Sequence, residues 1–203
     1  MKLQARGRAV FPKLNEPDTK FNPEGIFTTK LILSPEVADP LIAKLEAMQA
    51  EAVKKAQAKK KGKRVKQQDL PIQPAYDEDG NETGDYELKT KMKASGVSNK
   101  TGNPWTRKLP LFDSTGKPTN VQVGGGSEII CAMEASAYDS ASIGVGVTLR
   151  LEAVQVVNLA AGGSRSASDF AFGSVEGGFV STDESEVASS DETSEEDAAE
   201  YEF

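Results

Sequence analysis

The sequence predicts a mainly β fold: an antiparallel β-barrel with one helix, followed by a disordered acidic C-terminal tail. Short runs of alternating apolar and polar residues, separated by turn residues, are frequent enough for roughly six or seven strands. One longer segment instead has the apolar period of a helix. From about residue 160 the composition changes to glycine, serine and alanine, and then to acidic residues. We therefore assign residues 1–160 to one folded domain and residues 161–203 to a linker and tail.

The first two strands are expected at residues 2–11 and 26–33. In the first, Leu3 and Ala5 alternate with polar residues. Neighbouring residues of a strand point to opposite sides, so the basic side chains should share one face. These basic residues are Lys2, Arg6 and Arg8. The second strand is rich in β-branched and apolar residues, and proline, asparagine and glycine separate it from the first.

A single helix is expected after the second strand. Two start sites are compatible with the sequence, Ser34–Pro35 and Asp39–Pro40, because each places a capping residue before a proline. The apolar residues that follow form one stripe on a helix that reaches about residue 61: Leu41, Leu45, Met48 and Ala52. Residues 54–66 hold eight positive charges. These charges suit either a solvated helix end or contact with a DNA backbone.

The later strands supply a second basic face and a bend. In residues 86–93, one face carries Tyr86, Leu88, Thr90 and Met92, and the other carries Lys89, Lys91 and Lys93. Two longer apolar strands follow at 127–138 and 143–157. The alternation of the last strand shifts near Glu152 and Ala153, which predicts a bulge of the kind that bends strands around barrels.

The composition removes most enzyme classes. The chain has no histidine and one cysteine, so it lacks the commonest general base and any Cys/His metal set. We expect no catalysis, no metal and no cofactor. Cys131 lies in an apolar run and should be buried. No apolar run approaches the roughly 20 residues of a membrane span, so we expect a soluble protein with no membrane partner.

The charge is divided unevenly along the chain. The formal net charge is −7, but residues 183–203 hold ten acidic residues and no basic one. The rest of the chain, with 24 basic and 21 acidic residues, therefore carries a net charge of +3. A mildly basic body favours a polyanionic partner, and the strongly acidic tail is expected to compete with that partner for the basic residues of the body.

Basic and aromatic residues are interleaved in several strand-sized segments. Single-stranded nucleic acid is bound without sequence preference by cations that neutralise phosphates and by aromatic faces on which bases stack. Trp105, beside Arg107 and Lys108, is the strongest stacking candidate, although a lone tryptophan also suits a core. The candidate DNA-binding residues are Lys2, Arg6, Arg8, Tyr86, Lys89, Lys91, Lys93, Lys100, Trp105, Arg107, Lys108 and Phe112.

The chain ends in Tyr201, Glu202 and Phe203 after an acidic run. With this end, with residues 2–10 and with the segment FNPEGIFTTKLIL at residues 21–33, the sequence resembles the OB-fold single-stranded DNA-binding proteins of tailed bacteriophages. The resemblance implies an OB barrel that coats single strands in phage DNA replication, recombination and repair, in the cytoplasm of the infected bacterial host. It also implies that the tail end recruits replication proteins such as a DNA polymerase or helicase, through Glu200, Tyr201, Glu202 and Phe203.

One feature departs from the pattern of the family, and the sequence is compatible with more than one function. The OB helix usually follows the third strand, whereas the helix expected here follows the second. Duplex DNA remains a candidate partner because phosphate contacts are shared by both forms of DNA. An acidic-tailed interaction protein that binds no nucleic acid and a nuclease that uses carboxylates also remain compatible with these residues. So do a homodimer and a preference for RNA.

Overall fold

The computed structural model describes residues 1–59 and 65–160. The tail, with the predicted partner-binding residues Glu200 to Phe203, therefore lies outside the described residues, as do residues 60–64 of the lysine-rich segment. The described part forms nine strands and one helix: β1 (Lys2–Asp18), β2 (Ile26–Leu33), α1 (Pro35–Lys59), β3 (Ile72–Tyr76), β4 (Glu82–Lys93), β5 (Ser95–Val97), β6 (Pro104–Thr106), β7 (Leu111–Phe112), β8 (Glu128–Ser140) and β9 (Gly144–Asn158).

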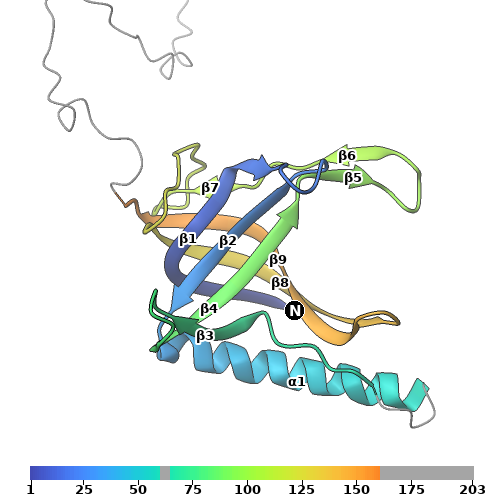
Figure 1. The fold of residues 1–203 in the computed structure, drawn as a ribbon. Coiled ribbons are helices and arrows are strands. Elements are labelled where there is room, and N and C mark those ends of the chain that lie inside the picture. The colour runs from blue at the N-terminus through green and yellow to red at the C-terminus, as the bar shows by residue number, and fades with distance from the viewer. Residues whose placement is uncertain (60–64, 161–203) are drawn as a thin grey trace, which may run out of the picture. The chain divides into compact units, whose positions relative to one another are not determined.

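Five of these strands close into a barrel. Their order is β1-β2-β4-β9-β8, and β8 returns to β1. All pairs are antiparallel except β4 with β9, which is parallel and joins at Lys91 and Arg150. This connectivity is that of an OB barrel, so the predicted fold class is confirmed. Figure 1 shows β1, β2 and β4 side by side on the near face of the barrel, with β8 and β9 behind them.

Two irregular strands bend the sheet into a closed shape. β1 pairs with β8 over Lys2–Arg8 and with β2 over Arg8–Asp18, so one long strand serves two neighbours. In β9 the partner of Ala132 is Ala153 and that of Met133 is Leu151, which leaves Glu152 as the extra residue. The bulge predicted near Glu152 or Ala153 is therefore confirmed.

The helix α1 covers one end of the barrel (Figure 1). It begins after Ser34, whose carbonyl accepts hydrogen bonds from the backbone N–H groups of Val37 and Ala38 at 3.1 and 3.0 Å. The alternative start at Asp39–Pro40 is wrong, since Pro40 lies inside the helix. Residues with helical spacing face the barrel and are buried: Ala38, Leu41, Leu45, Gln49 and Ala56. The helix follows the second barrel strand, as expected.

The core fills the space between the barrel strands and α1. Its fully buried side chains include Leu31 and Leu33 of β2, Leu45 of α1, and Met133 of β8. Each such side chain contributes about 1.5 to 3 kcal/mol relative to an exposed position. Cys131 is buried as predicted, and this burial raises the pKa of its thiol to about 12. Within the described ranges, no helix has the length and apolar character needed to cross a membrane.

A buried glutamine joins the helix to the β8–β9 hairpin. Gln49 of α1 is 2% exposed, and its amide nitrogen donates to the carbonyl of Gln68 at 2.5 Å. The amide nitrogen of Gln67 donates to the amide oxygen of Gln49 at 2.9 Å. The same segment pairs with the start of β9, because the Gln68 N–H donates to Val145 and the Val145 N–H donates to Lys66, each at 2.8 Å. The hairpin is therefore fixed relative to α1.

Candidate nucleic-acid interface

The outer face of β2 and β4 carries four lysines. In the antiparallel register, Lys30 of β2 lies directly opposite Lys89 of β4, and Thr28 lies opposite Lys91. Ile26 lies opposite Lys93. Directly opposed residues of two strands share a face, and the three lysines of β4 are exposed. The predicted ladder Lys89, Lys91 and Lys93 thus lies on one face. Lys30 adds a fourth cation, which the sequence pattern did not indicate because it interrupts an apolar run.

A groove of about 720 Å³ runs beside this lysine face. Lys30, Lys89 and Lys91 line one side, and Tyr138 and Ile143 of the β8–β9 hairpin line the other. Tyr138 lies against β9 at Gly146, where a Cβ atom would be 2.5 Å from the tyrosine Oη. Glycine at this position therefore lets the ring approach β9 closely. In OB folds, the face of strands two and three, flanked by the loop between strands four and five, is the usual place for an oligonucleotide.

Carboxylates neutralise some of these lysines. Glu87 contacts Lys30 at 3.0 Å and Lys89 at 3.2 Å, and Lys93 pairs with Glu24 at 2.9 Å. Burial alone would raise the pKa of Glu87, but the hydrogen bonds and charges of Lys30 and Lys89 outweigh it and hold that pKa below its usual value. Lys91 has no ion pair within the described ranges.

Two of the three predicted basic residues of β1, Lys2 and Arg6, lie on the side of the barrel next to β8. Arg6 pairs with Glu128 at 2.8 Å, and this contact raises the pKa of Arg6 and lowers that of Glu128. Lys2 lies opposite Glu134 of β8. Arg8 differs because it also lies opposite Ile32 of β2. Ile32 in turn lies opposite Glu87 of β4. The structure therefore brings only Arg8 of this set close to the lysine face.

Trp105 belongs to a second cluster, on the β5–β6 hairpin. Its indole lies against Gly96 of the paired strand, where a Cβ would be 2.8 Å from the ring. The guanidinium of Arg107 lies 4.5 Å from the ring centroid. Arg107 and Lys108 line a cavity of about 510 Å³ that also borders the β1–β2 loop, and Lys100 is exposed in the hairpin turn. The same cavity is lined by Glu24, the ion-pair partner of Lys93, so this cluster lies beside the end of the lysine face.

Two predicted aromatic contacts are placed away from the groove. Tyr86 packs against the core, opposite Leu33 of β2 and on the face of β4 that points away from the lysines. Phe112 is half-buried in β7, where it pairs with Gln155 of β9. Alternation along residues 86–93 already placed Tyr86 on the face opposite the lysines, whereas Phe112 lies between Leu111 and Asp113, outside any alternating run that would indicate the direction of its ring.

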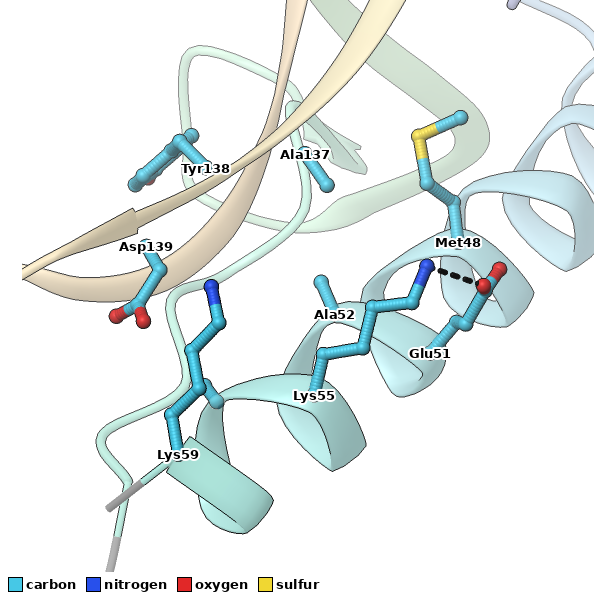
Figure 2. A pocket seen from close by; sticks show the side chains of 9 residues that line it. Met48, Glu51, Ala52, Lys55, Lys59, Ala137, Tyr138 and Asp139 are labelled. Carbon is cyan, nitrogen blue, oxygen red and sulfur yellow. Dashed lines mark ion pairs between the residues drawn. The ribbon is translucent and has the colours of Figure 1, made fainter.

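Tyr138 also borders a smaller cavity under the hairpin. This cavity of about 420 Å³ lies between α1 and β8 and is lined by Lys55, Lys59 and Tyr138, among others. Figure 2 shows Lys59 extending from α1 toward the end of β8, whereas Lys55 folds back to its ion pair with Glu51 at 2.6 Å. Lys55 and Lys59 of the lysine-rich segment thus line a cavity that borders the hairpin forming the groove wall.

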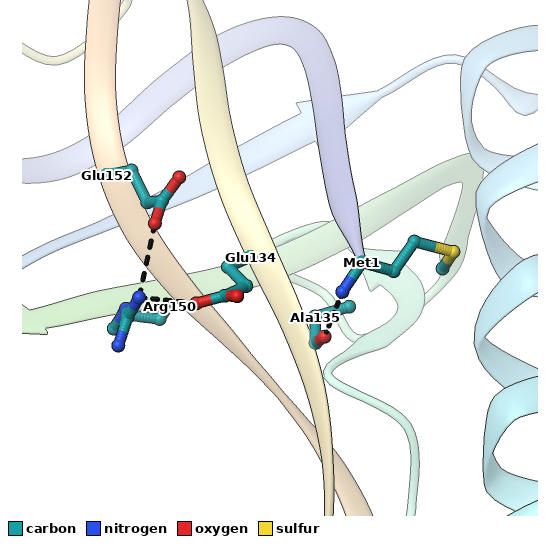
Figure 3. A network of polar contacts seen from close by, with 5 residues as sticks. All are labelled: Met1, Glu134, Ala135, Arg150 and Glu152. Carbon is teal, nitrogen blue, oxygen red and sulfur yellow. Dashed lines mark hydrogen bonds and ion pairs between the residues drawn. The ribbon is translucent and has the colours of Figure 1, made fainter.

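Arg150 of β9 lies next to Lys91, but its charge is paired with two glutamates. Arg150 pairs with Lys91 in the β4–β9 bridge, and its guanidinium contacts Glu134 and, at 3.2 Å, Glu152 (Figure 3). The N-terminal ammonium of Met1 donates to the Ala135 carbonyl at 2.9 Å in the same view. Within the described part of the chain, no group of three or more metal-ligating side chains is present.

Comparison with known proteins shows the fold. No family model and no curated protein matches the chain. Among solved structures, it is similar to gp2.5, a single-stranded DNA-binding protein of bacteriophage T7, with a TM-score of 0.68, 24% identity and coverage of 90% of this chain and 99% of that one. It is also similar to the single-stranded DNA-binding protein of bacteriophage Enc34 in complex with single-stranded DNA, with a TM-score of 0.54, 11% identity and coverage of 77% and 86%.

Proposed function

We propose that this chain binds single-stranded DNA without sequence preference, in the groove on the outer face of β2 and β4. The observation that carries the proposal is the placement of Lys30, Lys89 and Lys91 beside Tyr138 in one groove. Cations and an aromatic side chain are the two features that sequence-independent single-strand binding needs. The position of the groove and the fold shared with two phage single-stranded DNA-binding proteins support it.

In this proposal the lysines of the groove bind phosphates and the aromatic side chains stack on bases. Lys91 meets a phosphate first, because within the described ranges it has no carboxylate to displace. Lys30 and Lys89 then exchange Glu87 for phosphate oxygens. Tyr138 stacks on a base, and Trp105 with Arg107 offers a second stacking position beyond Lys93. None of these contacts reads base edges, which accounts for the lack of sequence preference.

The experiment that tests this function is a titration of a fluorescent oligo-dT and of a matched duplex at several salt concentrations. We expect tighter binding to the single strand. In Lys91→Ala the log–log salt dependence should be shallower by about 0.7, which is the single-strand value for one phosphate contact. Lys117→Ala, in the exposed turn after β7, is the matched control and should keep the wild-type slope. Equal binding of duplex and single strand, or a wild-type slope in Lys91→Ala, would refute the proposal.

We further propose that the acidic tail competes with DNA for the lysine face and recruits replication proteins when DNA displaces it. The charge distribution supports this proposal, because residues 183–203 carry ten negative charges and the rest of the chain has a net charge of +3. The aromatic residues Tyr201 and Phe203 would then contact a partner such as a DNA polymerase or helicase. In this scheme the protein acts in phage DNA replication, recombination and repair, in the cytoplasm of the infected host. The tail lies outside the described residues, so its role rests on composition.

A further inference from the structure

Phe11 has an unusual backbone and an unusual exposure. Its φ is 48°, and it is the one non-glycine residue with positive φ among those that the structure describes. Such a conformation is costly for a bulky side chain, because it brings Cβ close to the backbone. The side chain is also 79% exposed, although burial of a large apolar side chain such as phenylalanine is favourable. Strain and exposure together disfavour this arrangement in the isolated chain, and strained residues of this kind cluster at ligand-binding sites.

A bulge in β1 is what turns Phe11 outward. The register with β2 runs to Val10 opposite Lys30 and resumes at Lys13 opposite Thr28. Phe11 and Pro12 thus occupy the space that faces the single residue Thr29. Before the bulge the odd positions of β1 are buried, as at Leu3, Ala5 and Ala9. Continued alternation would point Phe11 into the core. Bulges beside functional sites commonly redirect a side chain in this way.

The bulge lies directly beside the lysine face. One row across the sheet joins Val10 of β1, Lys30 of β2 and Lys89 of β4. The next row joins Lys13, Thr28 and Lys91. The bulge falls between these two rows, on the β1 side of the face. Adjacent strands are about 4.8 Å apart, so β1 and β4 are separated by about 10 Å.

We infer that Phe11 is a base-stacking residue for single-stranded DNA, at the opposite edge of the lysine face from Tyr138. A single strand that crosses β1, β2 and β4 (Figure 1) would place phosphates on Lys30 and Lys89 while one base covers the Phe11 ring. Covering the ring removes its exposed apolar surface from water, which offsets the strain of the bulge. This inference rests on the proposed function and names a residue that no sequence pattern indicated.

The test uses a substitution that keeps the backbone and removes the ring. Asparagine tolerates positive φ, so Phe11→Asn should unfold at the wild-type denaturant midpoint or above it. Its affinity for oligo-dT should fall about 5- to 160-fold, the range that corresponds to one stacked base. Phe11→Trp should restore binding. The salt slope should stay unchanged in all variants, because no phosphate contact is lost. Tyr76→Ala, at an exposed aromatic residue of β3, is the matched control and should bind as wild type.

An oligonucleotide without bases separates stacking from other roles. On an abasic strand, wild type and Phe11→Asn should bind equally, since the backbone remains and the base is gone. If the deficit of Phe11→Asn persists on the abasic strand, or if oligo-dT binding is unchanged, the inference is wrong. A change of molar mass in sedimentation of Phe11→Asn would instead assign the residue to contact between copies of the chain. The proposed function itself fails if wild type does not bind oligo-dT more tightly than the matched duplex, or if Lys91→Ala keeps the wild-type salt slope.

Discussion

At the scale of single residues, Glu87 controls how much positive charge the groove offers. One carboxylate contacts both Lys30 and Lys89, and its side chain is 22% exposed. Partly buried pairs are screened less by salt than exposed pairs. A bound phosphate must therefore replace Glu87 at two ammonium groups, and this exchange reduces the net gain from each contact.

Replacing this carboxylate should strengthen DNA binding. In Glu87→Gln at neutral pH, Lys30 and Lys89 lose their competitor, so we expect affinity for oligo-dT to rise about two- to five-fold, most clearly at low salt. Fluorescence anisotropy at several salt concentrations measures this. Asp85→Asn, two residues before Glu87 on the same strand and outside these pairs, is the control. Weaker binding in Glu87→Gln would mean that Glu87 orders the lysines for DNA instead of blocking them.

The lowered pKa of Glu87 also sets the sign of a pH effect. A carboxylate whose pKa is depressed in the folded state stabilises the fold above its usual pKa of about 4.5 and loses that contribution as pH falls through the lowered value. Wild type and Glu87→Gln should therefore differ by a constant ratio in affinity between pH 7 and pH 5. The ratio should shrink only at more acidic pH, where Glu87 becomes protonated.

At the scale of elements, the β8–β9 hairpin forms the groove wall, and three features hold it. Gln49 of α1 anchors the segment that contains Gln67 and Gln68, and that segment pairs with Val145 of β9. Gly146 leaves room for the ring of Tyr138. The helix thus supports the candidate site indirectly, since it fixes the groove wall that carries the side chain of Tyr138.

This arrangement predicts a coupling between Gly146 and Tyr138. In Gly146→Ala the new Cβ would lie 2.5 Å from the Tyr138 Oη and 2.7 Å from its Cζ, so the ring must leave its place. We expect the affinity loss to match that of Tyr138→Ala, about 1 to 3 kcal/mol, and the double variant to be no weaker than either single one. Oligo-dT titration of the three proteins measures this. Gly125→Ala, where a Cβ meets nothing closer than 4.0 Å, is the control. If the affinity loss of the double variant equals the sum of the two single losses, Gly146 and Tyr138 act independently and the predicted coupling is wrong.

The same elements show what the sequence could predict. The two faces of β4 and the bulge at Glu152 follow from local alternation, which the strand period makes visible. The outward turn of Phe11 does not, because a bulge reverses the alternation without a change in composition. The inward ring of Tyr86 follows from the same alternation, which places it on the face of β4 opposite the lysines, so only its closeness to them in sequence suggested a contact with DNA.

At the scale of the whole molecule, the groove depends on contacts between distant parts of the chain. Tyr138 faces Lys30, more than a hundred positions earlier, because β9 joins β4 in parallel and carries the hairpin with it. The spacing of strands and turns predicts an antiparallel barrel, but local patterns contain no information on this pairing, so they could not predict that the hairpin lies beside β4. The position of the candidate site then follows from the barrel topology and not from any motif.

The whole molecule also combines a body of +3 with a segment of ten acidic residues, and this asymmetry leads to the last prediction. A flexible chain of the 44 residues from 160 to 203 would have a reach of roughly 35 to 40 Å, comparable to the diameter of a small domain. Under the proposed competition, such a tether would hold the acidic segment near millimolar effective concentration at Lys89 and Lys91. Deletion of residues 183–203 should therefore tighten oligo-dT binding, most strongly at low salt.

Removal of Phe203 alone is the matched control for this deletion, because all ten charges remain. Its DNA affinity should equal that of wild type, while its binding to the cognate replicative DNA polymerase, measured by surface plasmon resonance, should weaken. The deletion of residues 183–203 therefore tests competition with DNA, and the removal of Phe203 tests recruitment of the polymerase. If the 183–203 deletion leaves oligo-dT affinity unchanged at every salt concentration, the tail does not reach the lysine face, and only recruitment remains as its role. If Lys91→Ala also reduces the gain from the deletion, then tail and DNA share that lysine, since two ligands of one site must respond to the same substitution.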